Sequence, residues 1–272
     1  MKTVLKYPGS KWNLAQWIIS HMPPHTTYLE PFFGSGAVFF NKPPSNVETI
    51  NDIDGNVVNL FRVIREKPKE LSALIEMTPW ARDEYYASYE KTGDALEDAR
   101  RFLVRCWQAF GVKTYCRTGW RSDIQGRRGM WCVSQWRTMP DRIKAITERL
   151  RSVQIENEPA IKLIIRYKHR DVLIYADPPY VLKTRDGKKN YAHEMSDEEH
   201  LEILDILSAH PGPVILSGYA STLYDSRLKH WQRTTHKAQA EKGQMREEVL
   251  WINPVAAKTT GQLTMFDVGL EL

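Results

Sequence analysis

Alternation of short apolar strands with amphipathic helices is the feature that most restricts the fold of this 272-residue chain. The segment 171–176 (DVLIYA) is almost continuously apolar, which is typical of a strand buried in the middle of a parallel sheet. Helical patterns separate it from further strands, which are predicted at 27–31, 47–51, 153–155, 213–217 and 248–252. This order favours an α/β fold with a doubly wound, mostly parallel, Rossmann-like sheet.

Helices are predicted where apolar residues recur every three or four positions. Ser10 is expected to cap a helix that runs to about His21, and a second helix is expected to begin near Ser35–Ala37. An amphipathic helix is predicted over 94–110, with Phe110 as the last residue of its apolar face. Three more are predicted, after Asp54, from Pro140 and after a capping box at Ser196.

Composition narrows the class of protein without naming a function. Apolar residues make up 42% of the chain, which excludes a disordered chain. No apolar run approaches 18 residues and no signal peptide is recognisable, so we expect a cytoplasmic protein with no membrane contact. Three cysteines without CxxC spacing argue against a disulfide framework and against a zinc site, and no other metal-ligand cluster is apparent.

The positive charge is concentrated in one segment. Residues 100–140 hold nine Lys and Arg against one acid, whereas the whole chain carries a net charge of +5. The same segment contains four of the nine tryptophans, and its second half lacks a regular period. We therefore predict a smaller, loop-rich and partly helical insertion at 94–140, between 1–93 and 141–256, with a tail at 257–272. Trp107, on the apolar side of its helix, is interpreted as a core residue.

The most specific motif is Asp177-Pro178-Pro179-Tyr180, which directly follows the buried strand. Ligands of open parallel sheets bind at the carboxyl ends of the strands. The Asp177 carboxylate and the Pro178 carbonyl supply two hydrogen-bond acceptors, and Tyr180 supplies a flat stacking face. This set suits the exocyclic amino group of a heterocyclic base.

A second motif, Glu30-Pro31-Phe32-Phe33-Gly34-Ser35-Gly36, joins a predicted strand to a glycine turn that lets the backbone approach a ligand closely. Asp52 follows the next strand, about twenty residues on, where an acid that binds ribose hydroxyls is expected. The third glycine of a dinucleotide motif is absent. The pattern predicts an adenosine-containing cofactor, either a dinucleotide or S-adenosylmethionine.

These motifs occur in a fixed order: KYPGSK at 6–11, LEPFFGSG at 29–36, NDID at 51–54 and DPPY at 177–180. In this order the chain resembles the Dam-like DNA N6-adenine methyltransferases over residues 4–254. The resemblance implies a class I S-adenosylmethionine-dependent fold, in which a target-recognition segment lies between the cofactor motifs and the catalytic motif. It also implies methyl transfer to N6 of an adenine flipped out of duplex DNA, with S-adenosylhomocysteine as product and no metal.

The resemblance assigns roles to individual residues. Catalytic roles fall to Asp177, Pro178, Pro179 and Tyr180. Cofactor binding falls to Tyr7, Lys11, Glu30, Phe32, Gly34, Gly36, Asp52 and Asp177. Tyr7 stands where the best-known relatives have tryptophan, so this position departs from the family pattern while keeping an aromatic ring.

Contacts to double-stranded DNA are expected from the basic insertion and from the loop after DPPY, because arginines bind guanine edges and phosphates. The candidates are Arg117, Arg121, Arg127, Arg128, Lys183 and Lys188. Aromatic side chains of the insertion are expected to stack or to act as wedges.

Other hypotheses stay open from sequence. The chain could be an N-methyltransferase acting on RNA or on a protein amide, or a catalytically silent DNA-binding module. Gln262–Phe266 (QLTMF) resembles peptides that dock on bacterial sliding clamps. His193 and His200 are interpreted as structural or solvated. A monomer in a bacterial or phage-infected cell is expected.

Overall fold

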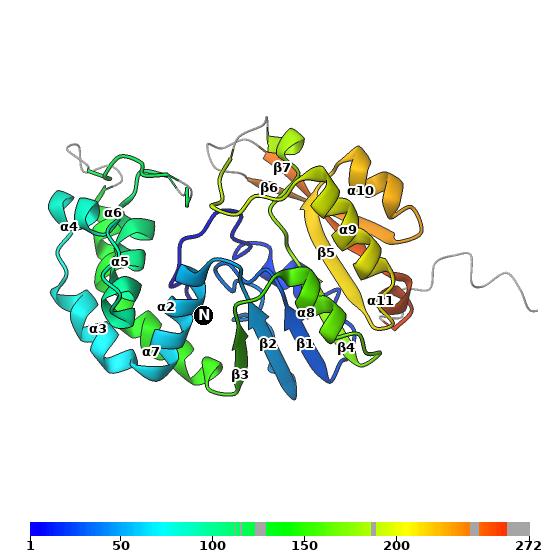
Figure 1. Ribbon diagram of the computed structural model, residues 1–272, viewed down its shortest axis with the longest axis horizontal. Coiled ribbons are helices and arrows are strands. Elements are labelled where there is room, and N and C mark those ends of the chain that lie inside the picture. Colours follow the sequence, from blue (N-terminus) through cyan, green and yellow to red (C-terminus); the bar gives the residue numbers. More distant parts are fainter. Residues whose placement is uncertain (112, 115, 123–128, 186–188, 240–244, 260–272) are drawn as a thin grey trace, which may run out of the picture.

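One mixed sheet organises the molecule. The computed structural model describes residues 1–272 except 112, 115, 123–128, 186–188, 240–244 and 260–272. Within that part the sheet order is β3-β2-β1-β4-β5-β7-β6 (Figure 1). The strands are β1 (Thr27–Glu30), β2 (Val47–Asn51), β3 (Val153–Glu156), β4 (Val172–Ala176), β5 (Val214–Tyr219), β6 (Gln232–Gln239) and β7 (Met245–Ile252). The first five are parallel, and β7 runs antiparallel to both β5 and β6. The predicted doubly wound α/β fold, that of a class I methyltransferase, is confirmed.

The two faces of the sheet are buried by different helices, because side chains alternate along each strand. Leu173 and Tyr175 of β4 belong to the core on one face, and Ile174 and Ala176 to the core on the other. The first face is covered by α1 (Ala15–Ile19), α2 (Gly55–Glu66) and α11 (Pro254–Thr259). The second, turned toward the viewer in Figure 1, is covered by α8 (Ala160–Arg166), α9 (Asp197–Ser208) and α10 (Thr222–Arg227).

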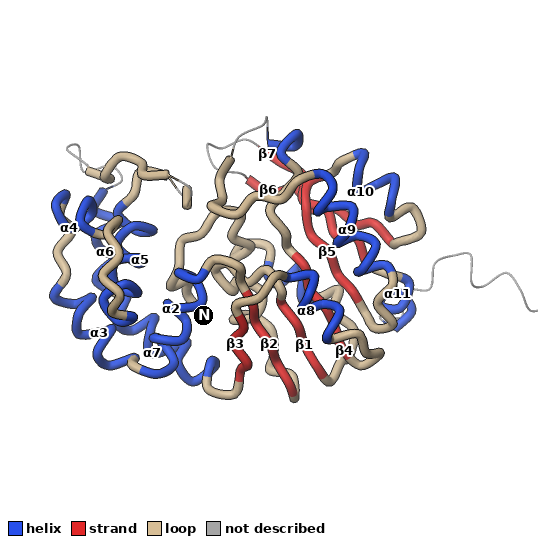
Figure 2. Tube along the Cα trace, viewed as in Figure 1, coloured by secondary structure: helices blue, strands red, loops and turns tan. Residues whose placement is uncertain are grey.

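The remaining α-helices gather beside the β3 edge of the sheet, at the left of Figures 1 and 2. They are α3 (Pro68–Met77), α4 (Arg82–Ala87), α5 (Ala95–Gln108), α6 (Gly129–Arg137) and α7 (Met139–Leu150), which together we call the helical lobe. The lobe shares the core of the first face of the sheet. Trp107 of α5 is 1% exposed and its indole donates a hydrogen bond to the Val4 carbonyl at 2.8 Å. The predicted core role of Trp107 is confirmed.

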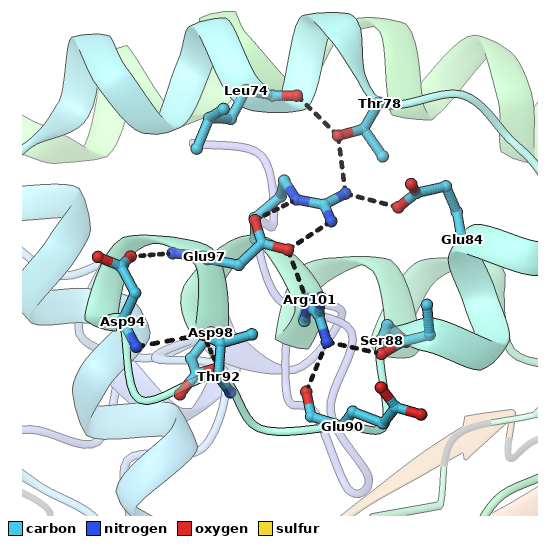
Figure 3. A network of polar contacts seen from close by, with 12 residues as sticks. Leu74, Thr78, Glu84, Ser88, Glu90, Thr92, Asp94, Glu97, Asp98 and Arg101 are labelled. Carbon is cyan, nitrogen blue, oxygen red and sulfur yellow. Dashed lines mark hydrogen bonds and ion pairs between the residues drawn. The ribbon is translucent and has the colours of Figure 1, made fainter.

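Some of the arginines in the basic segment stabilise the lobe itself (Figure 3). Arg100 donates to both carboxylate oxygens of Glu97 at 2.7 Å and also to Glu84 at 2.7 Å. Arg101 donates to Glu97 at 2.7 Å and to the backbone of the turn before α5. These hydrogen bonds lower the pKa of Glu97 to about 2. The acids lie before residue 100, so counting charge within 100–140 overstates the cations available to a polyanion.

Two predicted helix starts are wrong. Residues 34–41 form turns where a helix was expected to begin near Ser35–Ala37. The reason is local, because Gly34 and Gly36 have φ values of 49° and 65°, which no right-handed helix contains. Ser10 does not cap a helix: its hydroxyl lies 2.8 Å from the Ser35 hydroxyl, and α1 begins only after Leu14.

The other predicted helix caps agree with the structure, whereas one predicted helix end does not. Asp54 caps α2, and Ser196 forms the predicted capping box of α9. His200 of α9, interpreted as structural or solvated, is buried, with the Tyr224 hydroxyl 2.9 Å from its Nδ1. The helix predicted to reach Phe110 ends at Gln108, and Phe110 is 73% exposed. In the described chain no helix is both long and apolar enough to cross a membrane.

Candidate active site

The site lies where the order of the strands reverses. β1 and β4 are neighbours, but the chain continues from β1 toward β2 and β3 and from β4 toward β5. Connections at such a switch point diverge and leave a crevice at the carboxyl ends of the strands. A cavity of about 540 Å³ occupies this position, with Glu30 at the end of β1 and Asp177 after β4 both in its wall.

The structure brings together seven of the eight predicted cofactor residues. The cavity is lined by Tyr7, Lys11, Glu30, Phe32, Gly34, Asp52 and Asp177. Gly36 is buried behind the wall instead. A Cβ there would lie 2.4 Å from the Phe33 ring and 2.7 Å from the Phe40 ring, so this glycine is required for packing around the turn.

Gly34 and Asp52 connect the turns that follow β1 and β2. The Gly34 N–H donates to Asp52 Oδ2 at 2.7 Å, and the Asp54 N–H donates to Oδ1 at 2.9 Å. A Cβ on Gly34 would lie 3.1 Å from the Tyr7 ring. Burial raises the pKa of Asp52 from 3.8 to about 7, against the opposing effect of these amide donors. A ligand that donates hydrogen bonds to Asp52 would favour its ionised form.

Glu30 is a second acid with a high pKa in the cavity wall. It is 2% exposed and accepts a hydrogen bond from the Tyr28 hydroxyl at 2.7 Å. Burial raises the pKa of Glu30 from 4.5 to about 8, because the charged form loses its hydration. A cation bound in the cavity would favour the ionised form.

Asp177 lies at the centre of a polar network. Its Oδ2 accepts a hydrogen bond from Lys11 Nζ at 2.8 Å, and its Oδ1 accepts one from the Ser217 hydroxyl at 2.7 Å. Lys11 is 4% exposed and also donates to the Gly9 carbonyl at 2.7 Å. Burial works to lower the pKa of Lys11, but the Asp177 and Glu248 carboxylates outweigh it and raise that pKa above 10.5. The lysine therefore carries a positive charge beside Asp177 at neutral pH.

The DPPY residues divide between the cavity and the core behind it. Pro179 lines the cavity, whereas Pro178 and Tyr180 are buried and do not. Lys11 Nζ lies 4.7 Å from the centre of the Tyr180 ring. The Tyr180 hydroxyl donates to Glu248 Oε2 at 2.7 Å, a partner that the sequence analysis missed.

A loop for which the sequence offered no motif closes one side of the cavity. Tyr191 and Glu194 line it, and Arg185, in the 3-10 helix η1 (Leu182–Arg185), holds this loop in place. His193, interpreted as structural or solvated, is exposed and lines the cavity as well. The sequence signal that could have indicated this loop is its position, since an aromatic residue and an acidic residue follow DPPY within twenty residues.

The DNA-contact candidates have different surroundings. Arg117 is exposed, with its guanidinium 5.1 Å from the Tyr86 ring, and Lys183 is exposed and paired with Asp197. Arg121 is half-buried and donates to the Ala109 carbonyl and to Cys132 Sγ. Three further candidates and the tail motif lie outside the described residues, namely Arg127, Arg128, Lys188 and Gln262–Phe266.

Comparison with known proteins agrees with this geometry. A type II methyltransferase, M1.LlaDCHI of Lactococcus lactis subsp. cremoris, is 26% identical over 263 residues, 88% of each chain. DNA adenine methylases of Vibrio cholerae (classical Ogawa 395) and Escherichia coli K12 are 27% and 23% identical, over 70% and 82% of each chain. The family model of the D12 class N6 adenine-specific DNA methyltransferases matches residues 7–244. A match over most of the sequence shows that the chain belongs to this class of adenine-specific DNA methyltransferases.

Proposed function

We propose that this methyltransferase uses S-adenosylmethionine to methylate N6 of an adenine flipped out of duplex DNA, releasing S-adenosylhomocysteine. The observation that carries the proposal is the place of Asp177. It lies in the wall of the 540 Å³ cavity, at the carboxyl end of β4, with the aromatic ring of Tyr180 three residues on. An acceptor for the amino group of the base is therefore held beside the space for the methyl donor.

The cavity fits S-adenosylmethionine in size and chemistry. A volume of about 540 Å³ is in the usual range for a ligand of this size. Glu30 matches the positive charge of the methionine part, and Asp52 accepts hydrogen bonds from ribose hydroxyls. Phe32 and Tyr7 offer apolar surface, and Gly34 leaves room for close approach. When bound, S-adenosylmethionine supplies an activated methyl group.

The chain contributes positioning and hydrogen bonds on the side of the adenine. Asp177 and the Pro178 carbonyl accept the two N6 hydrogens, which directs the nitrogen lone pair away from them and toward the methyl donor. Lys11 and Ser217 fix the carboxylate, because each donates to a different oxygen. Holding reacting groups in such a geometry supplies a large part of enzymatic rate enhancement.

DNA contact is assigned to the segment after α5. Phe110 and Arg117 are exposed there, on a segment held by hydrogen bonds from Phe110 N–H to Gly119 O and from Arg121 N–H to Gln108 O, both 2.7 Å. An exposed aromatic ring stacks on bases or fills the space left by a flipped base, and arginine binds guanine or phosphate. Arg127, Arg128, Lys183 and Lys188 are proposed to add phosphate contacts.

Substitution of Asp177 tests the mechanism. Asp177→Ala is expected to reduce methyl transfer by about 10²-fold or more, the usual cost of losing a hydrogen bond specific to the transition state. Asp171→Ala, at an exposed position just before β4, is the matched control. Sequencing DNA from expressing cells for modified adenines reports substrate, base and site together. Retained activity in Asp177→Ala contradicts the mechanism, and methyl groups found on RNA or protein instead favour the alternative substrates.

Further proposals concern a partner protein, the oligomeric state and the cellular location of the enzyme. Gln262–Phe266 is proposed to dock on a bacterial sliding clamp by burying Leu263, Met265 and Phe266 in a groove. Deletion of 262–272 should abolish clamp binding while leaving methyl transfer on short duplexes intact, and unchanged clamp binding would end this idea. We further propose that the enzyme works as a monomer in the cytoplasm of a bacterial or phage-infected cell.

A further inference from the structure

The loop after the catalytic motif runs along the wall of the cavity. Its residues 189–195, which we call the strap, place Tyr191, Glu194 and neighbouring side chains in that wall. The Tyr191 ring packs against Tyr7, with 6.1 Å between ring centres. Its hydroxyl lies over Gly9, where a Cβ would be only 2.3 Å away, so the glycine allows the strap to approach this closely. The strap therefore touches the Tyr7-Gly9 side of the cavity directly.

Arg185 anchors the strap to the catalytic motif. This arginine is 6% exposed, and its Nε and Nη2 donate to the Tyr180 carbonyl at 2.9 and 2.6 Å. The same guanidinium pairs with Glu194 of the strap. Glu194 Oε1 in turn accepts the N–H groups of Asn190 and Tyr191 at 2.7 and 3.0 Å. A movement of the strap is thereby connected to the backbone of Tyr180.

Thr114 ties the strap to the segment assigned to DNA contact. Its N–H donates to the Asn190 carbonyl at 3.0 Å, and its Oγ1 accepts the Ala192 N–H at 2.9 Å. Thr114 follows the exposed Phe110 by four residues and precedes Arg117 by three. Both segments lie toward the top of Figure 1, with the helical lobe on one side and the sheet on the other. The described strap is thus bonded to the lobe segment and to the catalytic motif at once.

We propose that the strap couples DNA contact by Phe110 and Arg117 to closure of the cofactor cavity, and that Thr114 transmits the coupling. This inference rests on the proposed function of the site. Arg185 and Glu194 act as positioning residues in it, since they hold the strap and the Tyr180 backbone together. DNA bound at Phe110 and Arg117 strengthens the Thr114 contacts, and the strap then keeps Tyr191 against Tyr7.

Coupling of this kind is reciprocal. If DNA strengthens binding of S-adenosylhomocysteine by some factor, S-adenosylhomocysteine strengthens DNA binding by the same factor. Such factors usually lie between about 5 and 150. Because only a few hydrogen bonds connect Thr114 to the strap, we expect a coupling factor at the low end of this range, about 5- to 10-fold.

The test compares Thr114→Val, which keeps the shape of the side chain and loses its hydroxyl, with Thr114→Ser, which keeps the hydroxyl. Calorimetry measures binding of S-adenosylhomocysteine to the full chain with and without amplified bacterial genomic DNA, which carries no N6-methyladenine. Amide exchange over 189–195 is followed in the same samples. In the wild type and in Thr114→Ser, DNA should tighten binding by about 5- to 10-fold and slow exchange at Ala192. Thr114→Val keeps the N–H donor to Asn190 but loses the acceptor for the Ala192 N–H, so both effects should be clearly smaller than in the wild type.

The inference is overturned if Thr114→Val keeps the wild-type enhancement, or if DNA leaves both measurements unchanged in a wild type that methylates DNA. Failure of the proposed function looks different, because the wild type would then bind no S-adenosylhomocysteine or would place no methyl group on adenine in that DNA.

Discussion

The hydroxyl of Tyr180 donates a 2.7 Å hydrogen bond to the carboxylate of Glu248, and both side chains are buried, with 7% and 8% exposure. Glu248 lies on β7, opposite Tyr219 of β5. Tyr219 meets the Tyr180 ring edge-on, with 4.4 Å between ring centres. The orientation of the Tyr180 side chain is therefore fixed from β5 and β7, which contribute little to the wall of the cavity.

A double-mutant cycle should show that these two residues work as a pair. Tyr180→Phe keeps the ring and loses the hydroxyl that donates to Glu248, while Glu248→Leu removes the acceptor. Each is expected to lower kcat/KM for DNA, and the double variant should be no worse than the poorer single variant. The coupling should be about 1.5–3 kcal/mol, the contribution of a hydrogen bond to a charged group.

The control is Glu247→Gln, which changes the exposed neighbour on the same strand and should leave kcat/KM intact. Binding of S-adenosylhomocysteine should change little in any of these variants, because neither ring nor carboxylate lines the cavity. Additive losses in the cycle would mean that the hydrogen bond does not position Tyr180.

The high pKa of Glu30 predicts an unusual pH dependence of stability. In the unfolded chain this carboxyl has a pKa near 4.5, but in the folded protein it keeps its proton up to about pH 8. The folded state thus binds more protons across this window, so the free energy of unfolding falls as pH rises from 4.5 to 8 and levels off above. Glu30→Gln cannot ionise and still accepts a hydrogen bond from Tyr28.

Thermal unfolding of the chain without cofactor, followed by circular dichroism from pH 5 to 9, measures this effect. Tm of the wild type should fall more than Tm of Glu30→Gln, by about 5 °C or more, since 1 kcal/mol shifts Tm of a chain of this size by roughly 2–4 °C. Glu66→Gln, with a largely exposed carboxylate on α2, should follow the wild type. Parallel curves for Glu30→Gln and the wild type would contradict the assigned pKa.

Phe110→Ala tests the aromatic contact with DNA. Stacking on a base contributes about 1–3 kcal/mol, so KM for DNA should rise by about 5- to 150-fold. The melting temperature should not fall, because the ring is 73% exposed and packs little. Met77→Ala is the matched control, as Met77 is also 73% exposed but lies at the end of α3 in the same lobe. Equal KM values for both variants and the wild type would exclude Phe110 from the DNA contact.

The sequence by itself was sufficient for the five parallel strands, for β7 and for the residues at the carboxyl ends of β1, β2 and β4, but not for the edge strand β6. The apolar run of β4 and the Asp177-Pro178 turn after it are local features, and so is the Asp54 cap of α2. Such patterns depend only on residues close together in the sequence. They therefore predict a parallel sheet with acidic residues at the carboxyl ends of its strands. The glycines of LEPFFGSG were recognised, but not the positive φ angles of Gly34 and Gly36, which prevent a helix there.

Only the tertiary structure decided which charged and polar groups meet. Glu248 is 68 residues from Tyr180, and Lys11 is 166 residues from Asp177. Arg100 belongs to the basic stretch in sequence but to an acidic network in space. Pairings of this kind depend on how the sheet and the helical lobe pack, and no local pattern encodes them. The sequence alone determined the fold and the family resemblance, whereas packing decided how Tyr180 is held, where the strap lies and which arginines stay exposed.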